Sequence, residues 1–279
     1  MNKLKIAVTG ATGFIGRHVI TELLKHNVEI IATYHVKKNV ERHSSRLSWL
    51  PLDISKPSDN IFSKIGRPDV LIHLSWSGLP NYNSPHHYEE ELHNQYRFLK
   101  NMILSGLKSV VVAGTCFEYG MQSGALSAYM KTKPANSYSI AKDSLRKQLE
   151  LLKLTKNYRL IWARLFYMYG EGQSVTSLFP QLSKAVSEGE KSFKMSGGEQ
   201  IRDYMPVSKV AESLVKLAFH DGFSGIVNVC SGKPDSIKSI VEGWILENNW
   251  QIEPELGYYP YPEHEPMEFW GVKSNEDLY

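Results

Sequence analysis

Short apolar runs alternate with longer segments of helical periodicity over the first 165 residues of this 279-residue chain. Six runs are short and rich in β-branched residues, as buried strands are; they cover residues 5–8, 28–32, 47–52, 70–72, 110–112 and 160–162. The segments between them repeat apolar positions with the period of a helix; they cover residues 14–26, a stretch around Ile61, 88–105 and 137–156. This repeated βαβ pattern predicts an α/β fold with a Rossmann-type, doubly wound parallel sheet.

The pattern loosens after Arg164. The sequence is then typical of a loop, a helix, a turn, a helix and a strand at residues 170–175, 178–188, 197–198, 208–219 and 226–229. Residues 252–266 are rich in Pro, Tyr and Glu, which indicates irregular structure. We expect residues 1–164, with 203–230 returning to them, to form the sheet domain. Residues 165–202 and 231–279 are expected to form a smaller C-terminal α/β domain that covers it.

A glycine-rich loop, residues 9–16 (TGATGFIG), joins the first predicted strand to the first predicted helix. Glycines 10, 13 and 16 allow a tight turn, close approach of the backbone to a pyrophosphate, and close packing of helix on strand. The helix N-terminus then offers free N–H groups to the phosphates. A purely structural turn is the alternative, but the βαβ context favours dinucleotide binding. The predicted contacts are Gly10, Thr12, Gly13, Phe14, Ile15 and Gly16.

The end of the second predicted strand bears on which dinucleotide is bound. An acidic residue about 20 positions after the glycines normally holds the ribose 2′-hydroxyl of NAD. Residues 32–38 read ATYHVKK, with no acid and two lysines. Lys37 or Lys38 would attract the 2′-phosphate of NADP, and Tyr34 would lie at the adenosine end; alternatively, the lysines belong to a solvated loop. The pattern favours NADP(H), with NAD(H) possible.

The composition bears on what kind of molecule the protein binds. Hydrophobic content of 42% and charged content of 22% are ordinary for a soluble enzyme, and a net charge of +3 is too slight to indicate nucleic acid or an anionic membrane. Two cysteines, Cys116 and Cys230, make neither a disulfide framework nor a metal site. The first apolar run is too short for a signal peptide, and no run of 18 apolar residues follows. We expect a cytoplasmic protein that binds a small molecule and no metal.

The order and spacing of several motifs resemble the extended short-chain dehydrogenase/reductase family, in particular its nucleotide-sugar epimerases, dehydratases and reductases. The resemblance runs from Lys5 to about Gly232. Its carriers are the glycine loop, Leu52-Asp53-Ile54, LIHLSWSG at 71–78, Asn94, Thr115, the pair Tyr138 and Lys142, ARLFYMYGEGQ at 163–173, and GGEQIRDYMPVSKVAES at 197–213.

The resemblance implies a role for several side chains. Asp53 and its neighbour Ile54 would contact the adenine, Leu74 the cofactor, and Lys142 the nicotinamide ribose. Thr115 and Tyr138 would contact the reacting carbonyl, and Arg202 the diphosphate of a nucleotide sugar. Trp76, Cys116 and Tyr167 are further candidates for substrate binding. Tyr167 replaces the asparagine of many relatives, and Trp76 either shapes a sugar pocket or belongs to the core.

The spacing of tyrosine and lysine alone does not identify the catalytic pair. The chain holds four Tyr-x-x-x-Lys matches, at Tyr34/Lys38, Tyr96/Lys100, Tyr129/Lys133 and Tyr138/Lys142. Only Tyr138 opens a long predicted helix after the Thr115 loop, where side chains four apart share a face. A lysine cation on that face, with the positive charge of an oxidised nicotinamide, would lower the pKa of a phenol from its usual value near 10.

Comparison of the residues after Thr115 with those of the resembling enzymes argues against water elimination and against the cysteine-dependent epimerising mechanism. Sugar 4,6-dehydratases carry Asp and Glu at the next two positions, where this chain has Cys116 and Phe117. GDP-fucose synthases use a cysteine two residues beyond their serine, so Cys116 lies one residue early and is read as a small packed thiol. Glu118 is either a polar pocket contact or exposed.

With those reactions excluded, the family resemblance implies an NAD(P)H-dependent reductase of a nucleotide-linked 4-keto-6-deoxy sugar, dTDP-4-dehydro-6-deoxyglucose in particular, in surface polysaccharide (O-antigen) biosynthesis. Tyr138 would donate the proton and Thr115 would orient the keto oxygen. An NAD-dependent C4 epimerase with the same triad is the main alternative, and a non-catalytic dinucleotide-binding regulator is a more remote one. A homodimer is expected.

Overall fold

The central element is a seven-stranded parallel sheet. A computed structural model describes residues 3–35, 44–56, 58–263 and 265–273. The strand order is β12-β7-β5-β4-β1-β2-β3. The strands are β1 (Lys5–Thr9), β2 (Glu29–Tyr34), β3 (Leu47–Pro51), β4 (Val70–His73), β5 (Ser109–Thr115), β7 (Arg159–Leu165) and β12 (Gly225–Val229). All seven coincide with predicted runs, and the order reverses between β1 and β4. The predicted Rossmann-type α/β fold is therefore confirmed.

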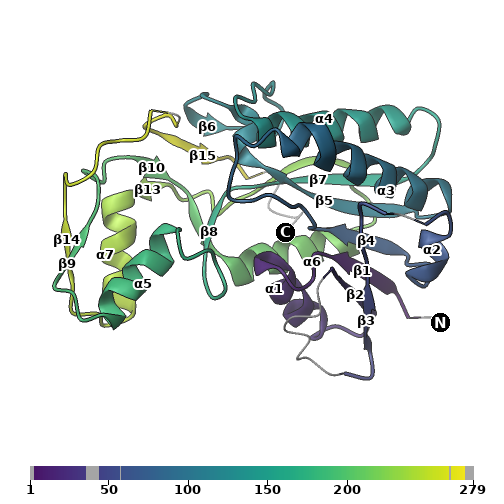
Figure 1. Cartoon of the computed structure of the whole chain (residues 1–279), viewed down its shortest axis with the longest axis horizontal. Helices are drawn as coiled ribbons and strands as arrows, with labels where there is room; N and C mark the ends of the chain where they lie inside the picture. The colour runs from purple at the N-terminus through teal and green to yellow at the C-terminus, as the bar shows by residue number, and fades with distance from the viewer. Residues whose placement is uncertain (1–2, 36–43, 57, 264, 274–279) are drawn as a thin grey trace.

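Helices cover both faces of the sheet (Figure 1). On one face α1 (Phe14–Leu23) packs beside α6 (Val207–Phe219), and on the other lie α2 (Ile61–Lys64), α3 (Leu92–Leu104) and α4 (Ser137–Leu152). A π-helical turn, η1 (His87–Glu91), precedes α3, so the predicted helix 88–105 is a composite. Each face has its own buried apolar cluster, typified by Val19 and Leu214 on one side and Phe98 and Leu149 on the other.

A smaller α/β layer lies beyond one end of the sheet, on the left of Figure 1. Its helices are α5 (Leu178–Ser187) and α7 (Ile237–Glu247), around a core that includes Leu182, Phe193 and Trp244. Short strands pair within it: β9 (Ser192–Lys194) with β14 (Glu253–Glu255), and β10 (Ile201–Arg202) with β13 (Asp235–Ser236). The prediction of irregular structure over residues 252–266 was wrong at β14. This strand could not be predicted locally, because it forms by pairing with β9.

Two further strand pairs join this layer to the sheet. β8 (Tyr167–Tyr169) pairs with β11 (Tyr204–Pro206), just beyond the ends of β7 and before α6. β6 (Gly124–Leu126) pairs with β15 (Phe269–Gly271), so the C-terminal segment returns to the loop that follows β5. Both pairs therefore lie near the carboxyl ends of the sheet strands, where parallel α/β folds bind their ligands.

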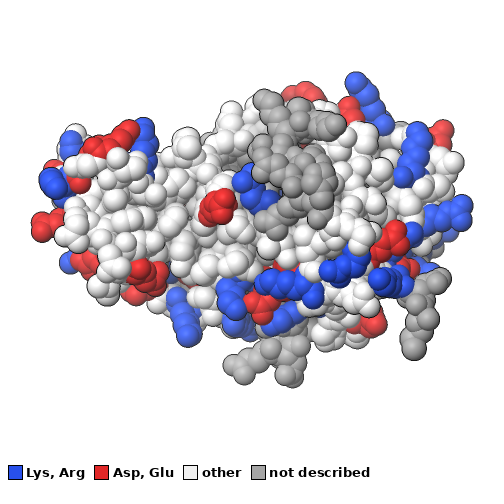
Figure 2. Space-filling view, turned by 90° about the horizontal axis from the view of Figure 1, so that it is seen from below, with Lys and Arg blue, Asp and Glu red and all other residues white. Residues whose placement is uncertain are grey.

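Charged side chains of both signs lie interspersed on the face of the molecule seen from below (Figure 2). None of the described helices is long and apolar enough to cross a membrane. Within the described ranges, no group of three or more His, Cys, Asp or Glu side chains is arranged to hold a metal ion.

Candidate active site

The glycine loop between β1 and α1 has the geometry of a phosphate cradle. Gly10 has φ +68°, and a Cβ there would lie 2.9 Å from the backbone nitrogen of Ser75. A Cβ at Gly16 would lie 2.1 Å from the carbonyl oxygen of Gly10, so this helix–loop contact requires glycine. Gly13 is the N-cap of α1 and no side chain caps the helix, which leaves first-turn N–H groups for an anion. Thr12, Phe14 and Ile15 complete the turn, and its residues fit a dinucleotide.

The adenosine end predicted from sequence lies where β2 and β3 finish together. Tyr34 ends β2, and its carbonyl accepts a hydrogen bond from the N–H of Leu52, the residue before Asp53. The Asp53 carboxylate accepts bonds from the side chain and backbone of Ser55, which lower its pKa. Ile54 packs against the core, and Leu74 reaches the glycine loop beside Gly10. Lys37 and Lys38 lie outside the described residues.

Thr115 ends β5 and is fixed by the turn that follows it. The residue caps the 3₁₀ helix η2 (Cys116–Tyr119), and its hydroxyl oxygen accepts a hydrogen bond of 3.2 Å from the Phe117 N–H. Its own N–H donates to Glu118 Oε1 at 2.9 Å, which completes a capping box. The hydroxyl proton of Thr115 remains available to a partner, and the Thr115 side chain is near enough to the Tyr138 hydroxyl to act on its pKa.

Tyr138 lies at the start of α4, where Asn136 caps the helix by accepting a bond from the Ser139 N–H. Its ring is enclosed by Trp76, Tyr82 and His87, with centroids 5.4–5.7 Å away. The Tyr138 N–H donates to the carbonyl of Tyr82, so the segment before η1 is tied to the helix start. Burial raises the pKa of Tyr138, while the Thr115 side chain lowers it by less.

Lys142 lies one turn along α4 from Tyr138 and is 2% exposed. Its Nζ donates to the carbonyl of Ala113 at 2.9 Å and lies 4.0 Å from the centroid of the Trp76 ring, a cation–π contact. Burial lowers the pKa of Lys142 to about 7, against the attraction of Glu118 and Glu91.

The pKa of Tyr138 moves in the direction opposite to the sequence-based expectation. The expected lowering required the Lys142 charge to act on the phenol. In the structure Lys142 donates to Ala113 instead, and burial of both groups favours their neutral forms. Without cofactor, the site therefore holds Tyr138 as a protonated phenol.

The lysine pKa predicts a pH-dependent stability. The folded protein loses the Lys142 proton above about pH 7, whereas the unfolded chain keeps it to 10.5, so this group stabilises the fold progressively as pH rises between those values. Below pH 7 its burial penalty is fully present. We expect the urea midpoint of the wild type to rise relative to that of Lys142→Met as the pH increases across this range. Lys147→Met controls for loss of charge at an exposed lysine on the same helix; a pH-independent difference for Lys142→Met would contradict the assignment.

Trp76 packs against the sheet core and also belongs to the site. Its ring contacts Tyr138 edge-on and covers Lys142, and its Nε1–H donates to His87 Nδ1 at 3.1 Å. His87 in turn donates through Nε2 to the carbonyl of Asn81 at 2.8 Å. From the sequence, Trp76 could either shape a sugar pocket or belong to the core. The structure places its ring directly against Tyr138 and Lys142, the candidate catalytic pair.

A buried hydrogen-bond chain that the sequence did not reveal fixes the loop carrying Trp76. The Thr9 hydroxyl donates to His73 Nδ1 at 2.8 Å, and His73 Nε2 donates to Gln95 Oε1 at 2.6 Å. Gln95 donates to Glu91 Oε1 at 2.7 Å, and Glu91 accepts from the Ser77 N–H at 2.7 Å. Burial lowers the pKa of His73 to about 3, so the imidazole is neutral. The only sequence signal was a histidine ending an otherwise apolar strand.

Glu118 is a structural residue, neither exposed nor a pocket contact. The carboxylate has no exposed surface and pairs with Arg164 Nε at 2.8 Å. It also accepts from Trp162 Nε1 at 2.8 Å and from the Thr115 N–H. Arg164 further donates to the Tyr119 hydroxyl at 3.0 Å. The partners lie on β7, more than 40 residues away, which is why the sequence alone could not assign Glu118.

Cys116 has the environment of a packed thiol. This agrees with the interpretation from sequence, in which Cys116 lies one residue before the position of a catalytic cysteine. The side chain is 6% exposed and contacts an apolar cluster that includes Leu126, Phe166 and Phe269. Burial raises the pKa of the thiol, with the charge of Glu265 adding to the effect. An inert thiol therefore stands next to Thr115.

Tyr167 and Arg202, the predicted substrate-phosphate contacts, lie together but are occupied by the C-terminal segment. The Tyr167 hydroxyl donates to Glu265 Oε1 at 2.8 Å, and Arg202 Nη2 donates to Glu265 Oε2 at 3.0 Å. The Tyr167 ring also stacks on Tyr204 with centroids 5.1 Å apart. Glu265 was not singled out from the sequence, because it lies 63 residues beyond Arg202 in a segment without a recognised motif.

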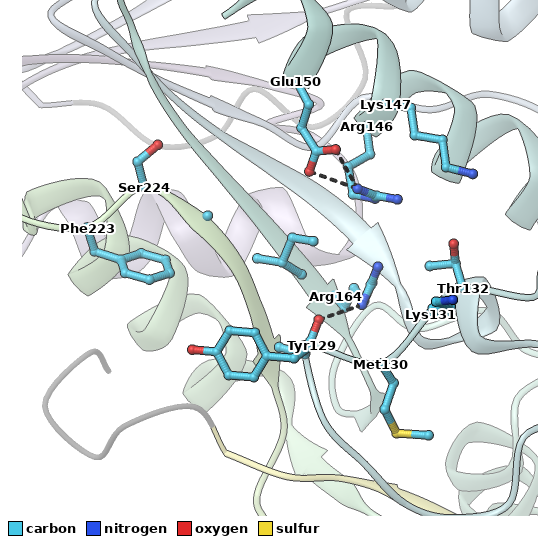
Figure 3. A pocket seen from close by; sticks show the side chains of 13 residues that line it. Tyr129, Met130, Lys131, Thr132, Arg146, Lys147, Glu150, Arg164, Phe223 and Ser224 are labelled. Carbon is cyan, nitrogen blue, oxygen red and sulfur yellow. Dashed lines mark hydrogen bonds and ion pairs between the residues drawn. The ribbon is translucent and has the colours of Figure 1, made fainter.

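A second hollow lies away from these residues. Its volume is about 800 Å³, and it opens between α4, the 128–132 segment and the start of β12 (Figure 3). Arg146, which binds Glu150 through two hydrogen bonds, lines one wall, and Arg164 reaches it from β7 (Figure 3). None of the predicted catalytic residues lines it.

The assembled fold and site define a dinucleotide-dependent enzyme of the short-chain dehydrogenase/reductase type. Residues 6–230 match the model of the NAD dependent epimerase/dehydratase family, and the chain belongs to that family. This confirms the resemblance drawn from the motifs.

Relatives in this family act on nucleotide sugars. The chain is 31% identical over 272 residues, 97% of its length and 100% of the relative's, to a dTDP-6-deoxy-L-talose 4-dehydrogenase (NAD(+)) from Aggregatibacter actinomycetemcomitans. It is 23% identical to the dTDP-4-dehydro-6-deoxyglucose reductase of Escherichia coli, over 85% of this chain and 79% of the relative. In fold it is similar to a UDP-N-acetylglucosamine 4-epimerase from Methanobrevibacter ruminantium M1, with TM-score 0.81, 20% identity, and 96% and 90% of the two chains covered.

Proposed function

We propose that this protein is a nicotinamide-dependent 4-ketoreductase of a dTDP-linked 6-deoxy sugar. The observation that carries the proposal is the grouping of Thr115, Tyr138 and buried Lys142, whose Nζ lies 5.8 Å from the centroid of the Tyr138 ring, with Cys116 and Phe117 where a dehydratase would carry its carboxylates. Two carboxylates near the turn after Thr115, Glu118 and Glu265, are each paired with an arginine. An acid–base pair for elimination of water is therefore missing at those positions.

The chain's own residues suit reduction of a ketone. The bound nicotinamide would supply the hydride. Tyr138, whose pKa is raised by burial, keeps its proton at neutral pH and gives it to the keto oxygen. Thr115 donates a hydrogen bond to the same oxygen and orients it. Trp76, Tyr82 and His87 exclude water around the phenol.

The names of two relatives support the choice of substrate. Both act on dTDP-linked 6-deoxy sugars, and both names refer to position 4. The cofactor is NAD or NADP: the lack of an acid after β2 and the presence of Lys37 favour NADP(H), whereas the name of the 31%-identical relative specifies NAD(+).

The test is turnover of 4-keto-6-deoxy sugars linked to dTDP, GDP, UDP and CDP, each with NADPH and with NADH. We expect reduced nicotinamide to be consumed in step with dTDP-sugar reduction, because a reductase releases oxidised cofactor at each turnover. A C4 epimerase, which regenerates its cofactor, would convert substrate with no net loss of nicotinamide absorbance. That outcome would overturn the proposal, as would binding of cofactor without conversion of any sugar.

Two further expectations accompany the proposal. The sheet domain, 1–164 with 203–230, would bind the cofactor, and 165–202 with 231–279 the sugar nucleotide. A homodimer remains a prediction.

A further inference from the structure

Arg202 is fully engaged by the C-terminal segment. Its side chain is 3% exposed, and Nη2 donates to Glu265 Oε2 at 3.0 Å and to the Pro266 carbonyl at 2.8 Å. Nη1 donates to the carbonyls of Ile201 at 2.9 Å and Met267 at 3.1 Å. The Phe269 ring lies 4.4 Å from the guanidinium carbon. Both terminal nitrogens of this guanidinium are therefore occupied while Glu265 remains in place.

The Glu265 carboxylate lies inside the substrate end of the site. One oxygen pairs with Arg202 and the other accepts from the Tyr167 hydroxyl. The carboxylate lines a small void together with Cys116 and Phe117 of the turn after Thr115, and its charge adds to the rise that burial causes in the pKa of Cys116, Tyr167 and Tyr204. The void left between this carboxylate and that turn is only about 20 Å³. The segment therefore closes the region where a sugar nucleotide would lie.

We propose that Glu265 is an internal competitor of the substrate diphosphate, and that it must leave Arg202 and Tyr167 before a nucleotide sugar binds. This inference rests on the proposed function and on the contact with the diphosphate that the family resemblance implies for Arg202. Arg202 Nη2 and the Tyr167 hydroxyl, the two donors that hold the Glu265 carboxylate, can equally donate to phosphate oxygens, so one anion replaces the other. The form that holds Glu265 does not bind nucleotide, and the apparent affinity falls by the fraction of protein in that form.

The segment is built so that Glu265 can move without unfolding the layer. On one side, β15 remains paired with β6, and the Ile201 N–H donates to the Met267 carbonyl. On the other side, Tyr258 and Tyr259 are about half exposed, at 52% and 54%, and are held mainly through the Met195 carbonyl. Between these anchors, the pair with Arg202 and Tyr167 is the principal contact of Glu265.

The test is calorimetric titration of dTDP into the wild type, Glu265→Gln and Glu268→Gln. Glu268 is exposed three residues further along the same segment, so its variant controls for loss of one negative charge. We expect dTDP to bind Glu265→Gln about tenfold more tightly than the wild type, and Glu268→Gln to bind like the wild type. In the wild type, dTDP is also expected to speed amide hydrogen exchange in the peptide that contains Glu265.

Equal or weaker binding of dTDP by Glu265→Gln would overturn the inference, because the carboxylate would then be neutral or helpful to the nucleotide. Arg202→Gln separates the two proposals. If it binds dTDP as well as the wild type does, the diphosphate does not meet Arg202 and the competitor role is lost. If dTDP behaves as expected but no 4-keto sugar is reduced, the reductase is wrong while the role of Glu265 stands.

Discussion

Replacing Tyr138 by phenylalanine is expected to lower turnover by about 10²–10⁴-fold, the range that a positioned acid–base group contributes. The change removes only the phenol hydroxyl, which lies near the Thr115 side chain. The ring keeps its contacts with Trp76, Tyr82 and His87, so the thermal midpoint is expected to stay close to that of the wild type. The measurement is kcat with the reduced cofactor saturating, alongside cofactor affinity, which should be unchanged.

The chain supplies its own control for this prediction. Tyr129 and Lys133 share the spacing of Tyr138 and Lys142, but Tyr129 is 91% exposed and lies at the rim of the second hollow. Tyr129→Phe is expected to leave kcat unchanged. Undiminished turnover in Tyr138→Phe would remove this phenol as the proton donor, whatever the control does.

Glu118→Leu is expected to lower the free energy of unfolding by about 3–5 kcal/mol, the usual cost of leaving one member of a buried ion pair alone. Arg164 would remain 1% exposed with its charge no longer neutralised, and Trp162 Nε1 would lose its acceptor. The measurement is chemical denaturation of the variant beside the wild type. Activity is expected to fall as well, because the Thr115 N–H loses the carboxylate that holds it.

A double-mutant cycle separates charge from packing. Glu118→Leu combined with Arg164→Leu removes both charges, so the double variant is expected to recover part of the stability lost by Glu118→Leu. If Glu118→Leu alone is as stable as the wild type, the pair contributes no stability and the account of Glu118 is wrong.

The sequence predicted those parts of the fold that local pattern determines. The sheet strands and the helices α1, α4, α5 and α6 are visible because each carries its own run or period of apolar residues. The π-helical turn before α3 and strands such as β14 were not predicted, since they form only against a partner elsewhere in the chain. Helix α7 was not predicted either, although Ser236 caps its N-terminus.

The candidate site divides in the same way. Thr115, Tyr138 and Lys142 were found through motif and spacing, and the structure brings them together. The environment of each group was not predictable, because it depends on residues distant in sequence. Burial by Trp76 and His87 raises rather than lowers the pKa of Tyr138. Glu265 reaches the site from the far end of the chain, beyond any motif.

The capping box around η2 has a consequence for how this enzyme can change. Thr115 and Glu118 fix the backbone of the turn through hydrogen bonds, and Glu118 is also anchored to β7. The side chains of Cys116 and Phe117 take no part in those bonds. They can therefore change without loss of those bonds, but Cys116 packs in a buried apolar cluster, so folded variants with altered reactions are expected from small replacements there combined with varied residues at 117. Mutagenesis for new chemistry is therefore best aimed there, with Thr115 and Glu118 held constant.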